Sequence, residues 1–521
     1  MFHHKDFASL ILSSMVLMMS LWLGGCTNFQ AARSTPTPAD SATPTPTPLK
    51  TYYVSLSGSD SNIGSELAPW RHIQYAVDHV KAGDIICVMK GVYNETVTFH
   101  TSGSAEGGYI TLQSYPGQAP VIDGGGLPVS GETGLVTIEN MSYIKLIGFE
   151  LRNLNGGGVK QAFPAGIWIK GHGDHLEIRG NRVHDIQNSC EECGAHGIAV
   201  YGRDAAASLH DIIIDGNEVY NNKLGWSESL VLNGNVEKFV VSNNKVHDND
   251  NIGIDLIGFE ETASDPSVDR ARDGTVTGNL VYNINSYGNP AYGKERSADG
   301  IYVDGGTNII VERNTVYKTN IGIELASEHA GKNTSCITVR NNFVYNNTQV
   351  GIAFGGYDTQ RGSTENCVIV NNTLYNNATQ GDWGAELYIQ FDTRHNIVKN
   401  NLVYANKARR FIDSWSPVMT GNQVDNNLYY AAGGGKNGKW IWKKKTYATF
   451  ASYQKATAND AHGLINLDPR FASLDLPDLH LQKTSPAIDK GQSLPEAGPQ
   501  DIDGQPRVQG AAIDIGADEA R

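Results

Sequence analysis

Carboxyl side chains stand at the centre of short apolar stretches in the middle of this chain. Asp255 lies between Ile254 and Leu256 in "IGIDLIG", and Glu324 lies at the same place in "IGIELAS". Alternate residues of a strand point to opposite faces, so these acids point away from the side that the apolar residues share. Carboxyl groups that gather in this way can exchange protons or hold a divalent cation.

The stretches recur, and aligning them places the acids in one outward-facing column. The central positions are Trp168, Ala199, Val231, Asp255, Tyr302, Glu324, Ala353 and Tyr388. Two positions after them stand Lys170, Tyr201, Asn233 and Asp304, and three positions before them stand His196, Glu228 and Asp299. Like charges on neighbouring strands repel each other. We therefore interpret the acids between Glu228 and Glu324 as a functional site on an open sheet face, where a cation, a substrate or a shared proton compensates their charge.

A repeat supplies the elements that must position this column. An asparagine phrase recurs from "NRVHD" at 181 to "NLVYA" at 401, and an Ile- and Val-rich phrase such as "DIIIDG" or "KFVVSN" precedes it. Three short strands in roughly thirty residues are typical of one coil of a parallel β-helix. The repeat predicts an all-β, right-handed parallel β-helix over residues 51–470, in which the asparagines form a structural ladder.

Both ends of the repeat are expected to be covered. In "WRHIQYAVDHV", residues 70–80, Ile73, Ala76, Val77 and Val80 have helical spacing, which predicts a short N-terminal capping helix. The Asp- and Gly-rich residues 471–521 predict a C-terminal extension that packs on the helix end. This extension resembles the terminal stretch of many exported bacterial β-helix proteins.

The first fifty residues do not belong to the predicted fold. Residues 1–26 have a short cationic start, an apolar run and the ending "LWLGGC", which resembles a bacterial lipobox. This resemblance implies a lipid anchor on Cys26 and an exported protein, either a cell-surface lipoprotein or an extracellular one. Residues 27–50 are rich in Pro and Thr and are expected to form an extended tether.

Composition narrows the class of partner. The chain has 521 residues and a formal net charge of −14. An acidic balance counts against nucleic acid, whose binding needs clusters of Lys and Arg. It permits an acidic polysaccharide if a divalent cation mediates the contact. We expect a monomer, and we expect "CEEC" at Cys190 and Cys193 to be a local disulfide or a metal-binding pair.

The opening "YYVSLSGSDSNIGSELAPWRHIQYAVDHVKAGDIICVMKGVYNE" resembles that of exported β-helix polysaccharide lyases, and most specifically polysaccharide lyase family 9, the pectate lyases. The resemblance implies Ca²⁺-assisted β-elimination of a pectate-like polyuronate. Glu228 and Asp255 match two acids that hold Ca²⁺ in that family. Its paired Asp residues fall here on Asn251 and Ile252, with Asp250 one place away as a substitute. We assign Asp299 to the same set of metal ligands.

The catalytic base is the main departure from that family. The strand that should carry its Lys is "DGIYVDG", which places Tyr302 there. The base is therefore Tyr302, or Lys294 or Arg296 from the loop "YGKERSAD". A tyrosine base needs a lowered pKa, which a nearby Arg296 or Ca²⁺ would provide.

Two other functions remain open. A glycoside hydrolase would use Asp255 and Glu324, which two strand steps would separate by roughly 9.5 Å, at the upper end of the range for inverting enzymes. A non-catalytic surface protein that binds glycans would also suit a lipid anchor and a repeat, because fold alone does not decide function.

Overall fold

The computed structural model describes residues 50–381, 383–475 and 477–520, which belong to one compact unit. The predicted signal peptide of residues 1–26, its Cys26 and the linker up to residue 49 lie outside the described residues. Within the described part of the chain, no helix is long and apolar enough to cross a membrane.

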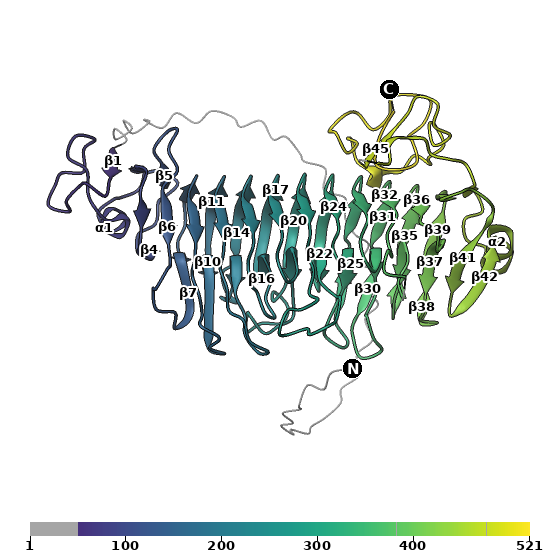
Figure 1. The fold of residues 1–521 in the computed structure, drawn as a ribbon, viewed down its shortest axis with the longest axis horizontal. Helices are drawn as coiled ribbons and strands as arrows, with labels where there is room; N and C mark the ends of the chain where they lie inside the picture. The colour runs from purple at the N-terminus through teal and green to yellow at the C-terminus, as the bar shows by residue number, and fades with distance from the viewer. Residues whose placement is uncertain (1–49, 382, 476, 521) are drawn as a thin grey trace, which may run out of the picture. The chain divides into compact units, whose positions relative to one another are not determined.

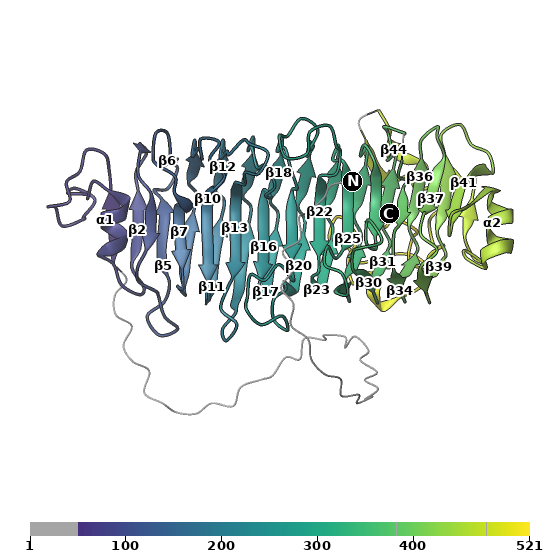
Figure 2. The ribbon, with the colours of Figure 1, turned by 90° about the horizontal axis from the view of Figure 1, so that it is seen from below.

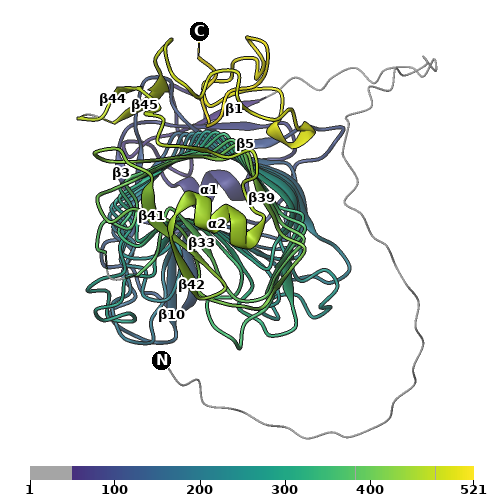
Figure 3. The same cartoon turned by 90° about the vertical axis from the view of Figure 1, so that its right-hand side faces the viewer.

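The described chain winds into successive coils, each of which contributes strands to three parallel sheets (Figures 1 and 2). We call two of them the acidic sheet and the tyrosine sheet, after the residues on their outer faces. We call the third the long sheet, because it has the most strands. From residue 162 onwards, each coil passes through the acidic, the long and the tyrosine sheet in that order. Figure 3 looks along the coils and shows the three sheets around a common interior. The predicted right-handed parallel β-helix is confirmed.

The strands have the following bounds. The acidic sheet holds β4 (Val97–Phe99), β7 (Gly131–Glu139), β10 (Ala162–Gly171), β13 (His196–Gly202), β16 (Leu230–Gly234), β19 (Ile254–Ile257), β22 (Asp299–Asp304), β25 (Ile321–Ala326), β29 (Val350–Phe354), β33 (Leu387–Ile389), β37 (Arg410–Ser414), β41 (Asn437–Trp442) and the antiparallel β42 (Lys445–Thr449). The tyrosine sheet holds β3 (Val92–Tyr93), β6 (Val121–Asp123), β9 (Glu150–Arg152), β12 (Arg182–His184), β15 (Glu218–Tyr220), β18 (Lys245–His247), β21 (Leu280–Tyr282), β24 (Thr315–Tyr317), β28 (Phe343–Tyr345), β32 (Thr373–Tyr375), β36 (Leu402–Ala405), β40 (Leu428–Ala431) and β43 (Leu464–Ile465). The long sheet holds β1 (Thr51–Val54), β2 (Ile85–Val88), β5 (Ile110–Ser114), β8 (Ile144–Ile147), β11 (Gly173–Arg179), β14 (Leu209–Asp215), β17 (Val236–Ser242), β20 (Arg272–Thr277), β23 (Thr307–Glu312), β26 (Asn333–Ser335), β27 (Thr338–Arg340), β30 (Ser363–Glu365), β31 (Val368–Val370), β34 (Thr393–Arg394), β35 (Ile397–Lys399), β38 (Met419–Thr420) and β39 (Gln423–Asp425).

Alternation along the strands of the acidic sheet separates the core from the outer face. Ile254 and Leu256 of β19 are fully buried in the common core, and Asp255 between them points outward. The glycine that precedes many of these strands allows close packing at the corner of the coil. A Cβ on Gly253 would lie 2.5 Å from the carbonyl oxygen of Gly300 in the next coil, so a larger residue there would displace the backbone.

The repeated asparagines form the predicted ladder. The backbone and side-chain amides of Asn217 both donate to Oδ1 of Asn244, at 2.9 and 3.0 Å, and the same pattern links each rung to the next. The rungs are Asn181, Asn217, Asn244, Asn279, Asn314, Asn342, Asn372, Asn401 and Asn427, and the ladder ends at Asp460. The ladder satisfies buried backbone amides at one corner of every coil, so its role is structural.

Short helices lie at the two ends of the coils (Figure 2). Helix α1 (Ile73–Asp78) buries Ile73, Ala76 and Val77 at the N-terminal end, where a capping helix was predicted, and α2 (Phe450–Thr457) lies at the C-terminal end. The C-terminal extension contains the antiparallel pair β44 (Phe471–Ser473) and β45 (Asp478–Leu481) and the 3-10 turn η1 (Pro495–Ala497). It packs against the side of the coils and not on their end, where it was predicted: the amides of Asn341 and Asn371 donate to the carbonyls of Ala497 and Asp514, each at 2.9 Å.

Candidate functional site

The outer face of the acidic sheet carries the predicted column in the predicted register. Asp255 pairs with Tyr302 in the next strand, and Tyr302 pairs with Glu324 in the one after it. The full aligned series is Trp168, Ala199, Val231, Asp255, Tyr302, Glu324, Ala353 and Tyr388. The sheet therefore brings Asp255 and Glu324 into one column although they are 69 residues apart in sequence (324 − 255).

The prediction that these acids stand on an open face is wrong. Asp255 is 2% exposed and Glu324 is 4% exposed, and three other acids of the face are also buried: Glu228, Asp299 and Asp304. Strand alternation gave the direction of the side chains correctly, but it carries no information about the loops at the two edges of the sheet. Those loops bury the carboxyl groups. We call Glu228, Asp255, Asp299, Asp304, Glu324 and Glu328 the carboxyl cluster.

Residues from the edge loops complete the cluster, and the sequence patterns did not identify them. Tyr292, from the loop between β21 and β22, accepts a hydrogen bond from the Asn251 amide at 3.3 Å. Glu328 follows β25, and its backbone amide donates to Asp304 at 2.8 Å. Gln390 donates to Glu324 at 2.5 Å. Of these, only Gln390 lies within one of the aligned phrases, two places beyond Tyr388. The loops that carry Tyr292 and Glu328 vary in length and do not align between repeats, so the sequence could not predict where these residues lie.

Asp299 and Glu324 interact directly within the cluster. The protonated Asp299 carboxyl donates a hydrogen bond to Glu324 across neighbouring strands. Burial and the charge of Glu324 raise the pKa of Asp299 well above its usual range. Burial raises the pKa of Glu324 to about 7, because the hydrogen bonds from Asp299 and Gln390 limit the increase. At neutral pH, therefore, Asp299 is protonated and the carboxyl group of Glu324 is about half ionised.

Asp255 is buried among the other carboxyl groups of the cluster. Burial raises its pKa well above the usual range, and the charges of Glu228 and Asp304 add to the effect. Within the described residues, Oδ1 of Asp255, Oδ1 of Asp299 and Oδ1 of Asn251 are buried without a hydrogen-bond partner. Buried oxygens that lack a partner carry a desolvation cost, which a proton donor, a sugar hydroxyl or a cation would relieve.

Tyr302 does not have the environment that a tyrosine base requires. Burial raises its pKa well above the usual range, and the neighbouring charges of Asp304 and Glu328 raise it further. The expected cationic neighbours lie elsewhere. Lys294 is exposed, and the guanidinium of Arg296 stacks over the ring of Tyr287 at 4.1 Å. Among these three predicted bases, the structure brings only Tyr302 to the carboxyl cluster.

Asp250 is also directed away from the cluster. Its Oδ1 accepts from the amide of Leu224 at 2.7 Å, and its Oδ2 lies 4.0 Å from Nζ of Lys223. With Tyr287 it lines a separate cavity of about 310 Å³ on the flank of the coils. The position of Asp250 therefore does not support its substitution for the missing family acids, because its carboxyl oxygens are held by Leu224 and Lys223 at this cavity.

The remaining predicted ligands offer the right donors without a closed metal site. Glu228, Asp255 and Asp299 supply carboxylate oxygens, and Asn251 adds a carboxamide oxygen without a partner, which is the donor type that Ca²⁺ prefers. Within the described residues, however, the cluster brings no three carboxylate or imidazole ligand atoms within 4.8 Å of one another. The donor chemistry fits Ca²⁺, and the spacing is wider than a bound ion requires.

An aromatic group borders the cluster on its N-terminal side. Nδ1 of His196 lies 3.5 Å from Oε2 of Glu228, and the hydroxyl of Tyr201 lies 3.5 Å from Nε2 of the same imidazole. Trp168 packs edge-on against both rings. Burial lowers the pKa of His196 to about 4, so its imidazole is neutral at neutral pH.

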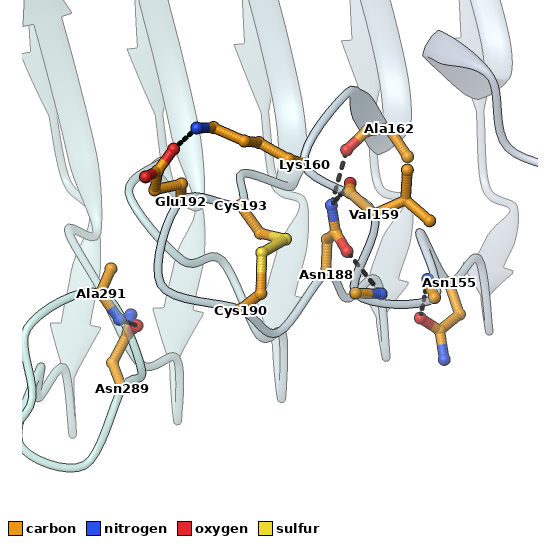
Figure 4. Close-up of a disulfide and its surroundings, with 12 residues drawn as sticks. Asn155, Val159, Lys160, Ala162, Asn188, Cys190, Glu192, Cys193, Asn289 and Ala291 are labelled. Carbon is orange, nitrogen blue, oxygen red and sulfur yellow. Dashed lines mark hydrogen bonds and ion pairs between the residues drawn. A yellow bond between two sulfur atoms is a disulfide. The ribbon is translucent and has the colours of Figure 1, made fainter.

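The "CEEC" motif is a disulfide, which joins Cys190 and Cys193 in the loop between β12 and β13 (Figure 4). In the same loop region, the Asn188 amide donates to the carbonyl of Ala162 at 2.6 Å, and Lys160 pairs with Glu192. The alternative of a metal pair is excluded for these two sulfurs, since each is bonded to the other.

Comparisons with known proteins agree with the fold. A family model described as "Pel9A-like, right handed beta helix region" matches residues 52–223, and one described as "Right handed beta helix region" matches residues 267–453. The uncharacterized protein YwoF of Bacillus subtilis (strain 168) is 42% identical over 436 residues, which is 84% of this chain and 91% of YwoF.

Two further similarities are more distant. The pectate lyase PEL9 of Emericella nidulans is 34% identical over 145 residues, which cover 25% of this chain and 33% of that enzyme. The crystal structure of the GH136 lacto-N-biosidase from Eubacterium ramulus superimposes with a TM-score of 0.51 at 13% identity, over 74% of this chain and 68% of that one. At this identity the structural match indicates a shared fold and no more.

Proposed function

Because this chain belongs to the same family as YwoF, the pectate-lyase-like right-handed β-helix proteins, we propose that it is a carbohydrate-active enzyme that cleaves a polysaccharide at the carboxyl cluster. The paired acids Asp299 and Glu324 support proton transfer to and from a glycosidic bond, which is the chemistry of a glycoside hydrolase. This hydrolase differs from the one that the sequence suggested, because Asp299 joins Glu324 as the acid partner.

In this proposal Asp299 gives its proton to the glycosidic oxygen as the bond from that oxygen to the anomeric carbon breaks. Water then supplies a hydroxyl group to the anomeric carbon, and the proton released from that water passes to a carboxylate. Asp255, on the strand before that of Asp299, is the candidate for this carboxylate, and direct activation of water by Asp255 predicts inversion. If Glu324 on the following strand instead attacks the anomeric carbon as a nucleophile, a covalent glycosyl-enzyme forms, Asp299 takes the proton from the water that hydrolyses it, and the configuration is retained.

The observation that carries this proposal is the split in pKa between two acids that are hydrogen-bonded to each other. A general acid must keep its proton near neutral pH, and its partner must be able to ionise. Burial and mutual charge give Asp299 and Glu324 these two properties. β-Elimination requires a deprotonated base. Tyr302 does not meet this need, because its raised pKa keeps the phenol protonated.

A second candidate function is Ca²⁺-assisted β-elimination of a polyuronate. It is favoured by the relative PEL9 and by the unpartnered Oδ1 atoms of Asn251 and Asp255. Glu228, Asn251, Asp255 and Asp299 would hold the ion, and bound Ca²⁺ would neutralise a substrate carboxylate and acidify the proton on carbon 5. This chain's own contribution to the proton transfer would come from a neutral base, for which the imidazole of His196 is available near Glu228.

One assay separates these functions. The protein is incubated with neutral polysaccharides and with polyuronates, with added Ca²⁺ or with a chelator, and two products are followed. Hydrolysis releases reducing ends with no ultraviolet absorbance from unsaturated ends, and the chelator leaves it unchanged. Elimination produces that absorbance and stops when Ca²⁺ is removed. Binding without either product, on the full panel, would favour the non-catalytic glycan-binding alternative and reject both enzymes.

A further inference from the structure

Exposed aromatic side chains lie next to the carboxyl cluster at its N-terminal end. Trp226 is 48% exposed, and its ring centre lies 4.9 Å from that of Tyr292. The hydroxyl of Tyr292 accepts from the amide of Asn251, four residues before Asp255 in the same coil. One half-buried ring therefore links an exposed indole to the site. Large exposed aromatics beside a polar site are typical of surfaces that bind a ligand.

The disulfide loop holds Trp226 in place. The backbone amide of Trp226 donates to the carbonyl of Cys193 at 2.9 Å, and Gly225 forms an antiparallel bridge with Gly194. Cys193 is fixed in turn by its bond to Cys190 (Figure 4). A side chain that projects from a braced turn loses less conformational freedom on binding than one on a free loop.

A second aromatic pair lies beyond the C-terminal end of the cluster. The rings of Trp383 and Tyr388 are 5.7 Å apart, and both side chains are partly exposed. Tyr388 stands in the central column two strand steps past Glu324, roughly 9.5 Å away, with Ala353 between them. These rings pack on Ala353 and on its apolar neighbours Ile321 and Val350.

The acids therefore lie between two aromatic surfaces along the helix axis. Trp226 comes just before β16, and Tyr388 lies in β33, five strand steps later, which is roughly 24 Å. This span is long enough for several sugar units, and the acidic positions of β19, β22 and β25 fall within it. The apolar faces of sugar rings stack on aromatic side chains, while their hydroxyl groups bond to polar groups between them.

We propose that Trp226 with Tyr292, and Trp383 with Tyr388, are saccharide-binding platforms on opposite sides of the scissile bond. A polysaccharide lies along the coils, occupies both platforms and is cut in its interior. This inference rests on the proposed function, because the cluster must be the place of cleavage for the platforms to flank it. It adds the direction of the chain and the endo-acting mode.

Binding is tested without catalysis. Asp299→Asn protein is run in native gels that contain soluble xylan, mixed-linkage β-glucan or polygalacturonate, alone and with Trp226→Ala or Trp383→Ala added. Each tryptophan variant should bind about tenfold more weakly than the parent, as expected for the loss of a central aromatic contact. Tyr287→Ala is the matched control, since Tyr287 is 44% exposed on the same loop as Tyr292 but lines the flank cavity.

The outcomes are distinct. Unchanged retardation of both tryptophan variants overturns the platforms, as does a wild-type protein that none of these polysaccharides retards. An equal loss in Tyr287→Ala would assign binding to the flank cavity instead. A parallel loss in Cys190→Ser/Cys193→Ser would support the brace on Trp226.

Cleavage is tested with the wild-type chain on the polysaccharide that it degrades. Internal cleavage predicts an early fall in solution viscosity and a first set of products several sugars long. Release of only mono- or disaccharides from the start would overturn the endo-acting mode and leave the proposed function intact. Absence of any product from the full panel would reject the proposed function, while the gel experiment would still decide whether the platforms bind glycan.

Discussion

The carboxyl group of Asp299 donates a hydrogen bond to the carboxylate of Glu324 on the adjacent strand, so two buried acids share one proton. Neither strand sequence alone creates this pair: Asp299 pairs in register with Ile321, and Glu324 pairs with Tyr302. Their side chains converge diagonally across the outer face of the acidic sheet. The raised pKa of Glu324, about 7, makes the protonation state of the pair sensitive to pH in the physiological range.

Activity should rise as the pH rises through about 7 if Glu324 is the nucleophile. The pKa of Glu324 lies there, so Glu324 is protonated below this pH and becomes the ionised partner of the protonated Asp299 above it. A plot of kcat/KM against pH should then show an ascending limb near 7. A flat profile from pH 5 to about 9 would contradict this assignment.

Asp299→Asn should reduce kcat by on the order of 10²-fold or more, because it removes the proposed general acid and retains the shape of the side chain. The matched control is Asp460→Asn. Asp460 is also buried, and burial raises its pKa to about 6, but it ends the asparagine ladder. There an Asn side chain can keep the bond that Oδ1 accepts from the Asn427 amide, and its Nδ2 can donate to the hydroxyl of Tyr429, which in the wild type donates to Oδ2 of Asp460. Activity of the control should stay near that of the wild type.

Stability should also depend on Glu324. Its pKa rises from 4.5 to about 7 on folding, so between these values the folded protein keeps a proton that the unfolded chain has released. The free energy of unfolding then falls as pH rises, by about 1.4 kcal/mol per pH unit for one such group. This contribution is fully present below about 4.5 and is lost above about 7. Glu324→Gln should therefore be more stable than the wild type at pH 8 and similar to it at pH 4.5, as urea unfolding would measure.

Sequence patterns predicted the coils and the column well because both follow from a local rule that is repeated. Each strand phrase fixes its own inward and outward residues, and stacking the phrases fixes the register of Asp255, Tyr302 and Glu324. The burial of the site could not be predicted in this way. It depends on Tyr292 and Glu328, which come from loops of irregular length. Asp250, Lys294 and Arg296 were assigned to the site because they lie close to it in sequence. In the structure they lie outside the carboxyl cluster, because the turns that hold them do not follow the repeat.

Asn314→Ala should destabilise the protein by about 1–3 kcal/mol, because it leaves buried backbone groups without their hydrogen bonds. Oδ1 of Asn314 accepts from the backbone amide of Asn279 at 2.9 Å, and its Nδ2 donates to the carbonyl of Val276 at 3.0 Å. The urea midpoint should fall while the activity per folded molecule is kept. Loss of activity with unchanged stability would give the ladder a role that we do not assign to it.

Attachment through Cys26 is a separate proposal from the sequence. If "LGGC" is a lipobox, the mature protein begins at Cys26, carries acyl chains and partitions into detergent. Cys26→Ser should move the protein into the aqueous phase and leave the activity of the enzyme unchanged. Recovery of a mature wild-type protein that lacks acyl chains and begins at another residue would reject the anchor.

Asp255→Asn distinguishes the two proposed mechanisms. Asp255 is buried among other acids, which disfavour its ionised form in the folded protein. A neutral amide does not carry this cost, so the variant should be more stable than the wild type at pH 8. Activity should fall in either mechanism. If Asp255 is the base of a hydrolase, no concentration of Ca²⁺ should restore the activity. If it holds Ca²⁺ together with Glu228 and Asn251, the amide oxygen should remain a weak ligand, and excess Ca²⁺ should recover part of the loss.

Calorimetric titration of the wild type and of Asp255→Asn with Ca²⁺ provides a readout that is independent of turnover. Weaker binding by the variant supports a metal site that includes Asp255. Equal binding by both proteins, or no binding by either, removes Asp255 from such a site. Unchanged activity of a well-folded Asp255→Asn variant would remove this residue from both mechanisms.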